Sequence, residues 1–146
     1  MIAVLRNIVA LLAGLVVGGL VNMGLIMLGP SIIPPPSGVD VTDPASIAAS
    51  MHLFEAKHFI VPFVAHAAGT LVGATIAFVL AVSHRPHFAY LVGALFFAGG
   101  ISASFMIPAP IWFIGVDLVF AYFPMAWLGV TLASRFVRGP GQDTRP

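Results

Sequence analysis

The chain has 146 residues, of which 60% are hydrophobic and only 8% are charged, with six basic and five acidic side chains. Its mean hydropathy of +1.06 excludes a soluble enzyme, because so few charges cannot coat a water-exposed surface. The net charge of +1 offers no basic field for nucleic acid, and the absence of cysteine excludes disulfides, thiolate metal sites and cysteine nucleophiles. The composition is therefore that of an integral membrane protein.

Four apolar runs are each long enough to cross a membrane, because a hydrocarbon core of about 30 Å needs roughly 20 helical residues. They cover residues 8–28, 59–82, 88–107 and 111–133, and Asp117 is the one formally charged residue within them. The first run is too long for the hydrophobic core of a signal peptide, so we expect a retained anchor. The sequence predicts an all-α integral membrane four-helix bundle formed by a single domain, residues 1–134.

One long loop, residues 29–58, follows the first span, whereas short turns at 83–87 and 108–110 join the other spans. Short turns make consecutive helices antiparallel neighbours. The four spans therefore place both termini on one side of the membrane and the long loop on the other.

The long loop is predicted to contain a short helix. Ile33-Pro34-Pro35-Pro36 is expected to be extended, since proline fixes its own φ and keeps the preceding residue out of the helical region. Asp43 before Pro44 is a typical helix start, with a capping carboxylate and a proline at the first helical position. We predict a helix from Pro44 to about Lys57, lying on the membrane surface or forming part of an ordinary structured loop.

The basic residues predict the orientation of the chain. Five of them share the side of the termini and one lies on the side of the long loop; they are Arg6, Arg85, Arg135, Arg138 and Arg145 against Lys57. Because basic residues accumulate in cytoplasmic segments, both termini are expected in the cytoplasm and the long loop outside. The Gly- and Pro-rich segment 135–146 is expected to be a disordered cytoplasmic tail.

Small residues at helical spacing mark the faces on which membrane helices pack, because they allow close backbone approach. Each of the first three spans carries such glycines: Gly14, Gly18, Gly69, Gly73, Gly93 and Gly100. We interpret them mainly as packing sites within the bundle, with contacts between copies of the chain as the alternative.

Each span also contributes one polar residue at a similar depth, in the half of the membrane nearest the long loop: Asn22, His66, Ser104 and Asp117. An Asp at the bilayer centre costs about 2.5 to 3.5 kcal/mol on insertion scales, so it normally has a partner or a task. The simplest interpretation is a satisfied polar core in which His66 bonds to Asp117. The alternatives are a proton or cation site, since His titrates near neutral pH, and a small polar ligand such as a lipid headgroup.

Five residues could in principle ligate a transition metal: His52, Glu55, His58, His66 and Asp117. Glu55-x-x-His58 is similar to half of the motif of di-iron bundles, but those sites need the motif twice and two further glutamates. This chain has one glutamate. No cofactor is therefore predicted, and a bound transition metal is kept as an alternative.

Several segments resemble small, uncharacterised bacterial four-span inner-membrane proteins with no assigned activity. These are Ile33 to Asp40, Lys57-His58-Phe59, His66 to Gly73, Pro108 to Phe113, Asp117 and Pro124 to Trp127. The resemblance covers about residues 5–134 and implies a multi-pass protein of the bacterial inner membrane. It carries no activity to this chain.

The absence of nucleotide-binding loops, nucleophile elbows, haem-attachment motifs and zinc-protease helices favours a non-enzymatic protein. We expect an accessory or structural component whose partners are the lipid bilayer and either further copies of itself or a larger membrane complex, not nucleic acid. The alternatives are a carrier of protons, ions or a small ligand through the polar cluster, and a metal-dependent membrane enzyme.

Overall fold

The computed structural model describes residues 1–137, which are largely helical and include no β-strand. In chain order the helices are α1 (Ile2–Ile32), α2 (Pro44–Ser50), α3 (Ile60–Leu80), α4 (Arg85–Met106), α5 (Ile111–Phe120) and α6 (Phe123–Val137). Short 3₁₀ turns at Met51–Leu53 and Ala56–Phe59 lead into α3. Four segments are long and apolar enough to span a membrane: Ile2–Ile32, Ala56–Leu80, Arg85–Met106 and Ile111–Val137. The all-α four-span fold with a short helix in its long loop is thus confirmed.

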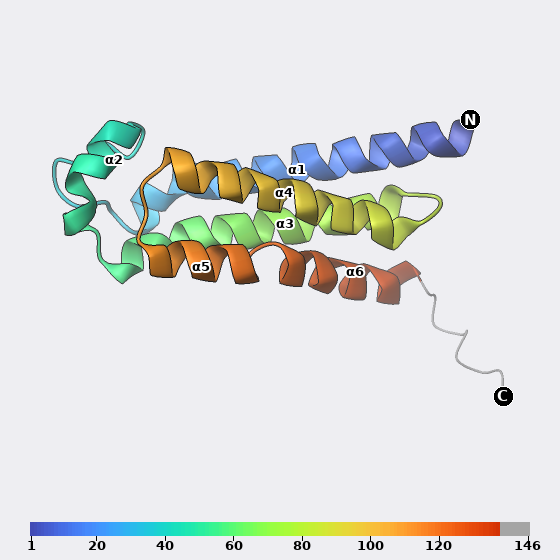
Figure 1. Ribbon diagram of the computed structural model, residues 1–146. Coiled ribbons are helices and arrows are strands. Elements are labelled where there is room, and N and C mark those ends of the chain that lie inside the picture. Colours follow the sequence, from blue (N-terminus) through green and yellow to red (C-terminus); the bar gives the residue numbers. More distant parts are fainter. Residues whose placement is uncertain (138–146) are drawn as a thin grey trace.

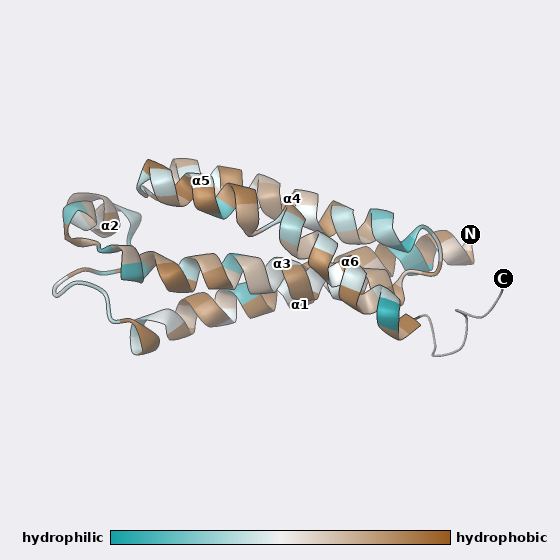
Figure 2. Ribbon diagram, turned by 90° about the horizontal axis from the view of Figure 1, so that it is seen from below, coloured by the Kyte–Doolittle hydropathy of each residue, from teal (hydrophilic) through white to brown (hydrophobic). Residues whose placement is uncertain are grey.

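The long helices run side by side along one axis, and α5 followed by α6 forms the fourth rod (Figure 1). α2 and the long loop lie at one end of the bundle, which we call the loop end, and the start of α1 lies at the other, the termini end. α3 is the central helix, since it packs against α1, α4 and α6. Hydrophobic residues run along the length of all four rods (Figure 2), and many large ones are exposed, as lipid contact requires.

Two helices in the first half of the chain differ in length from the sequence prediction. α1 begins at Ile2 and continues to Ile32, with Pro30 in its last turn, so it exceeds the predicted span 8–28 at both ends. α2 starts where predicted, because the Asp43 carboxylate accepts hydrogen bonds from the backbone N–H groups of Ala45 and Ser46. It ends at Ser50, however, rather than near Lys57, and 3₁₀ turns with an extended residue at Phe54 follow it.

The fourth span is not one continuous helix, as 111–133 was predicted to be. It breaks at Ala121 and Tyr122, between α5 and α6. Pro124 explains the break, since it has no N–H to donate to the carbonyl of Phe120. α6 then continues to Val137, three residues into the segment 135–146 that was expected to be disordered, and residues 138–146 of that segment lie outside the described residues.

Glycines provide the contact between α1 and α3. A Cβ atom at Gly14 would lie 2.6 Å from the carbonyl oxygen of Gly73, and one at Gly73 would lie 2.7 Å from that of Gly14. Gly18 and Gly69 face each other in the same way one turn further along. Only glycine allows the two backbones to approach so closely. On α4, Gly93 lies against Ala126, so a glycine also allows α6 to pack closely against α4.

At the termini end, Asn7 of α1 holds the turn between α3 and α4. Its Oδ1 accepts from the backbone N–H of Val82 at 2.9 Å, and its Nδ2 donates to the hydroxyl of Ser83 at 2.8 Å. Asn7 is 6% exposed, so these bonds satisfy a polar side chain that is buried in the bundle.

Candidate functional site

A chain of three polar side chains crosses the interior of the bundle between α3 and the break in the fourth span. His66 Nδ1 lies 2.9 Å from both Asp117 Oδ1 and Oδ2, and the Tyr122 hydroxyl donates to Asp117 Oδ2 at 2.9 Å. The rings of His66 and Tyr122 are stacked, with centroids 6.0 Å apart. Asp117 is 5% exposed and Tyr122 2%, so the carboxylate is satisfied inside the protein rather than by lipid or water. We call these three residues the polar triad.

Local sequence features hold the triad in place. Tyr122 is five residues after Asp117, and on an unbroken helix the two side chains would point about 140° apart. The break before Pro124 turns the Tyr122 ring back towards the carboxylate. Gly100 on α4 makes room for it, since a Cβ atom there would lie 2.6 Å from Tyr122 Cζ. On α3, the Thr70 hydroxyl donates to the backbone carbonyl of His66 at 2.8 Å. Its hydrogen is therefore already used, and Thr70 does not donate to the triad side chains.

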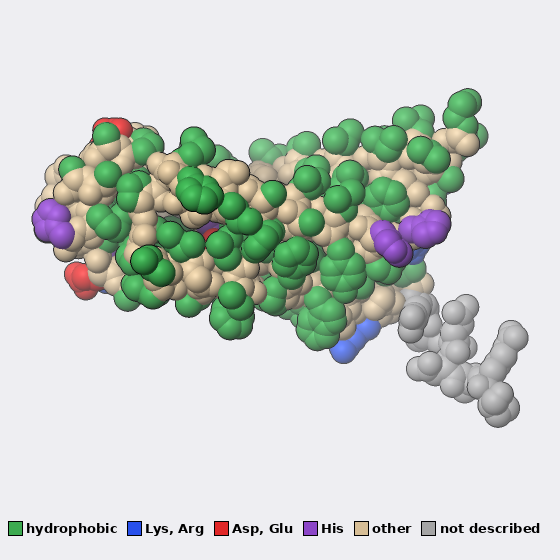
Figure 3. Space-filling model, in the orientation of Figure 1, with side chains coloured by type: hydrophobic (Ala, Val, Ile, Leu, Met, Phe, Trp, Pro, Cys, Tyr) green, Lys and Arg blue, Asp and Glu red, His purple; other side chains and the backbone are tan. Residues whose placement is uncertain are grey.

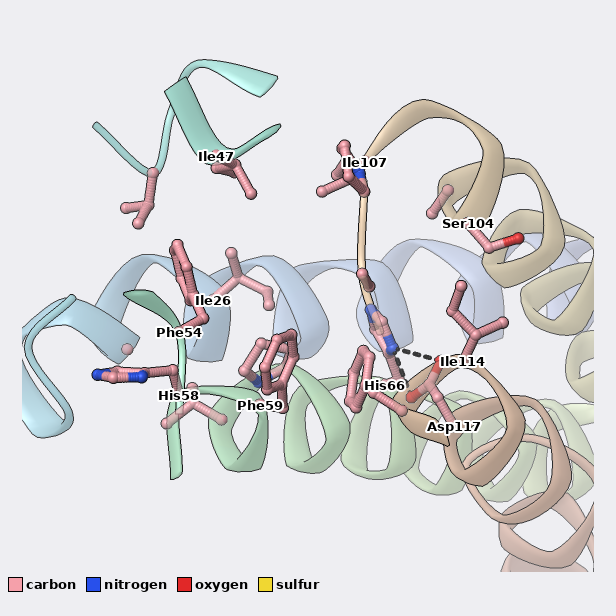
Figure 4. A pocket seen from close by; sticks show the side chains of 18 of the residues that line it. Ile26, Ile47, Phe54, His58, Phe59, His66, Ser104, Ile107, Ile114 and Asp117 are labelled. Atoms are coloured by element: carbon pink, nitrogen blue, oxygen red, sulfur yellow. Dashed lines mark hydrogen bonds and ion pairs between the residues drawn. The ribbon is translucent and has the colours of Figure 1, made fainter. Parts of the chain in front are cut away.

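Two residues of the triad, His66 and Asp117, lie at the inner end of a cavity of about 260 Å³ in the loop half of the bundle. The cavity is bounded by the end of α1, the long loop, the start of α3, the end of α4 and α5. Its walls are largely apolar; typical residues are Ile26, Ile47, Phe54, Phe59, Ile107 and Ile114. Figure 4 shows His66 and Asp117 joined at one end of this space, with Ile47 and Phe54 across it on the loop side. The loop therefore covers the cavity as a lid.

The cavity also opens sideways. The space-filling view shows a hollow between α4 and α5, at the floor of which acidic and histidine side chains are visible (Figure 3). The helices on either side of it carry exposed large apolar side chains, among them Phe105 of α4 at 86% and Ile111 of α5 at 89%. In a membrane these side chains contact lipid, so the hollow faces the hydrocarbon rather than water.

Aromatic side chains fasten the lid to the bundle. Phe59, which is 8% exposed, lies 4.9 Å from Phe113 and 5.5 Å from Trp112 between ring centroids. Phe54 contacts the ring of Phe59 from the loop side, at 6.1 Å. These contacts join the loop, through the 3₁₀ turn before α3, to α5 at the mouth of the cavity.

The structure distributes the four predicted polar residues unequally. His66 and Asp117 are bonded, whereas the Ser104 hydroxyl lines the cavity but donates to the carbonyl of Ile101 in its own helix, at 2.7 Å. Asn22 lies on α1 against Gly69, and its buried Oδ1 has no hydrogen-bond partner within residues 1–137. A buried amide oxygen of this kind is commonly satisfied by an ordered water.

The five residues considered as metal ligands do not come together. His66 bonds to Asp117, while Glu55 donates its backbone N–H to His58 Nδ1 at 2.8 Å and pairs with Lys57 at 3.0 Å. This hydrogen bond from Lys57 holds the pKa of the exposed Glu55 carboxyl below its usual range. Glu55-x-x-His58 thus starts the helical segment before α3, and no three His, Asp or Glu side chains in the described part of the chain are placed to share a metal ion.

The sequence analysis did not select Tyr122, because aromatic residues are common in membrane helices. The signal that points to it is Pro124, because a proline two residues later breaks the helix and redirects the side chain. Comparison of the chain with known protein families, with curated proteins and with solved structures gives no significant match.

Proposed function

We propose that this protein is a non-enzymatic, multi-pass membrane protein that binds an amphipathic small molecule taken from the membrane. The cavity is the observation that carries this function: it has largely apolar walls, a polar inner end at His66 and Asp117 with His58 on the opposite, loop side, and an opening between α4 and α5 that faces lipid. The sequence analysis gave a small polar ligand such as a lipid headgroup as an alternative; the proposal keeps a small ligand but gives it an apolar body and entry from the hydrocarbon.

The chemistry of the walls determines the class of ligand. A fully polar ligand would leave the apolar walls without complementary contacts, and burial of its other polar groups there would be costly. A pure hydrocarbon would contact the apolar walls but leave the exposed part of the His66 ring without a polar partner. A molecule with an apolar body and one polar group matches both surfaces.

The accessory-subunit hypothesis receives less support from the packing glycines. All six lie against side chains or backbone of the same chain: Gly14, Gly18, Gly69, Gly73, Gly93 and Gly100. Their close contacts are therefore used in folding the bundle, so they do not in themselves require a partner protein or a second copy.

We further propose that the chain lies in the bacterial inner membrane with its termini in the cytoplasm. The bacterial location is supported by the resemblance described above, and the orientation by the basic residues. Arg6, Arg85 and Arg135 lie on the segments that reach the termini end, whereas Lys57 lies at the loop end. The loop lid would then cover the cavity from the outer side.

Mass spectrometry of organic extracts from purified protein tests ligand binding. Ala103 lines the cavity, so Ala103→Trp fills it, whereas Ala98→Trp adds the same side chain at an exposed position of α4 that does not line the cavity. An amphipathic compound is expected at near-stoichiometric amounts in wild type and Ala98→Trp, and at least about tenfold less in a folded Ala103→Trp. Equal amounts of every compound in the three extracts would contradict the proposed function.

A further inference from the structure

We infer that the polar group of the ligand is an uncharged hydrogen-bond acceptor, such as a ketone or ester carbonyl, which accepts from the Nε2–H of His66. The inference rests on the proposed function and names the ligand class for the same cavity. Its argument depends on where the protons of the His66–Asp117 pair lie.

The pair carries one proton along the bond between Nδ1 and the carboxylate, whose atoms are 2.9 Å apart. If that proton lies on Nδ1 and the ring is an imidazolium, both ring nitrogens are protonated. If it lies on the carboxyl, Nδ1 accepts from Asp117 and the neutral ring carries its own proton on Nε2. In both arrangements the pair has no net charge, and in both Nε2 is a donor.

Two other arrangements would make Nε2 an acceptor. In one, Asp117 is protonated on Oδ2 and Nδ1–H donates to Oδ1; since Oδ2 already accepts from Tyr122, its own buried O–H would be left without an acceptor, which is costly. The other has an ionised carboxylate and a neutral ring protonated on Nδ1 alone. It leaves a net negative charge inside the membrane. Tyr122 donates a hydrogen bond to this carboxylate but carries no positive charge, and no Lys or Arg of the described chain lines the cavity. Lys57, the basic residue of the loop, is paired with Glu55. Because a buried charge without a counter-charge is costly, the uncharged pair is favoured.

Nε2 of His66 is available to a ligand in the cavity. It makes no hydrogen bond within residues 1–137, while the His66 side chain is 23% exposed and lines the cavity. The other polar groups at this end are engaged, since the carboxylate of Asp117 accepts from Tyr122 and the Ser104 hydroxyl donates to Ile101. The inner end therefore presents one free donor, His66 Nε2–H.

The inner end offers one hydrogen-bond donor and no cation, and this determines which polar group of a ligand can bind there. A phosphate or carboxylate would bring a negative charge into a cavity that has no Lys or Arg among its lining residues. A carbonyl oxygen accepts the single hydrogen bond without adding charge. A ketone or ester at the end of an apolar body therefore fits the inner end better than an anionic headgroup does.

Nitrogen NMR of protein labelled with ¹⁵N-histidine tests the inference through the ring itself. The chain has five histidines, and the His66 signals are identified by their loss in His66→Gln. We expect Nε2 of His66 to be protonated at neutral pH in the detergent-purified protein. Addition of 2-undecanone is expected to shift the Nε2 signal, whereas undecane, which has the same chain length without the carbonyl, is expected to leave it unchanged. The shift is expected to persist in Ala98→Trp and to be lost in Ala103→Trp.

Each outcome separates the two proposals. An unprotonated Nε2, or equal responses to 2-undecanone and undecane, overturns the carbonyl inference; the proposed function then still stands if an amphipathic compound is extracted from wild type but not from Ala103→Trp. A protonated Nε2 with no response to either probe also overturns the inference. If, in addition, no compound depends on Ala103, both proposals fail.

Discussion

Asp117 links the other two residues of the polar triad, since its carboxylate bonds to both His66 and Tyr122. Asp117→Ala removes both partners and leaves a buried hydroxyl and a ring nitrogen unsatisfied. We expect the free energy of unfolding to fall by about 1 to 3 kcal/mol. The measurement is reversible unfolding of the detergent-solubilised protein, followed by circular dichroism.

Asp117→Asn is the matched control for this substitution. The Asn oxygen can accept from Tyr122 while its amide donates to His66 Nδ1, so both bonds are retained without an ionisable group. Its stability is expected to lie within about 1 kcal/mol of wild type. If Asn destabilises as much as Ala, the charge of Asp117 rather than its hydrogen bonds holds the site together.

Depth along the helices was enough to predict that His66 and Asp117 lie close together, but not which polar residues complete the site. Ser104 and Asn22 have the predicted depth, yet the Ser104 hydroxyl bonds to its own helix and Asn22 packs against Gly69 on α3. Depth does not specify rotation, and a side chain with a free local carbonyl often bonds to it. Tyr122 joins the site only because the helix breaks, which periodicity alone does not reveal.

At the scale of single helices, the contact between α1 and α3 depends on glycines that have no room for a methyl group. A Cβ atom at Gly73 would lie 2.7 Å from the carbonyl oxygen of Gly14, so Gly73→Ala must push the two helices apart. We expect a loss of about 1 to 3 kcal/mol in the free energy of unfolding, as for other overpacked interiors. The same unfolding measurement in detergent checks it.

Gly19→Ala is the control on α1. A Cβ atom at Gly19 would meet nothing within 4 Å, and alanine is the better helix former. This variant is expected to be as stable as wild type or more stable. Equal losses in Gly73→Ala and Gly19→Ala would mean that backbone flexibility, not close approach of the helices, is the reason for these glycines.

The elements were predictable to the extent that composition and periodicity determine them. The four spans follow from apolar run length, and the start of α2 follows from Asp43 and Pro44. The end of α2 was not predictable in this way, because residues after Ser50 are held by the aromatic contacts of Phe54 with Phe59 and of Phe59 with α5 rather than by helical propensity. Tertiary packing decides such boundaries.

At the scale of the whole molecule, the cavity is a property of the assembled bundle. It forms where the broken fourth span and the end of α4 diverge and the long loop covers the space between them and α1. No single segment carries a signal for it, since its walls are the same apolar residues that elsewhere fill a membrane helix. This is why the sequence analysis predicted the polar pair His66 and Asp117 but not the apolar cavity beside it.

The orientation of the whole molecule decides from which side the loop lid covers the cavity. The chain has no cysteine, so single cysteines can be introduced without interference. Ser37 at the loop end and His87 at the termini end are both exposed, and they provide Ser37→Cys and His87→Cys. In intact bacterial cells a membrane-impermeant maleimide is expected to label Ser37→Cys and not His87→Cys, with both labelled after permeabilisation. The physical reason is the excess of arginine at the termini end, which favours retention of that end in the cytoplasm. Labelling of His87→Cys alone in intact cells would reverse the orientation and turn the lid towards the cytoplasm.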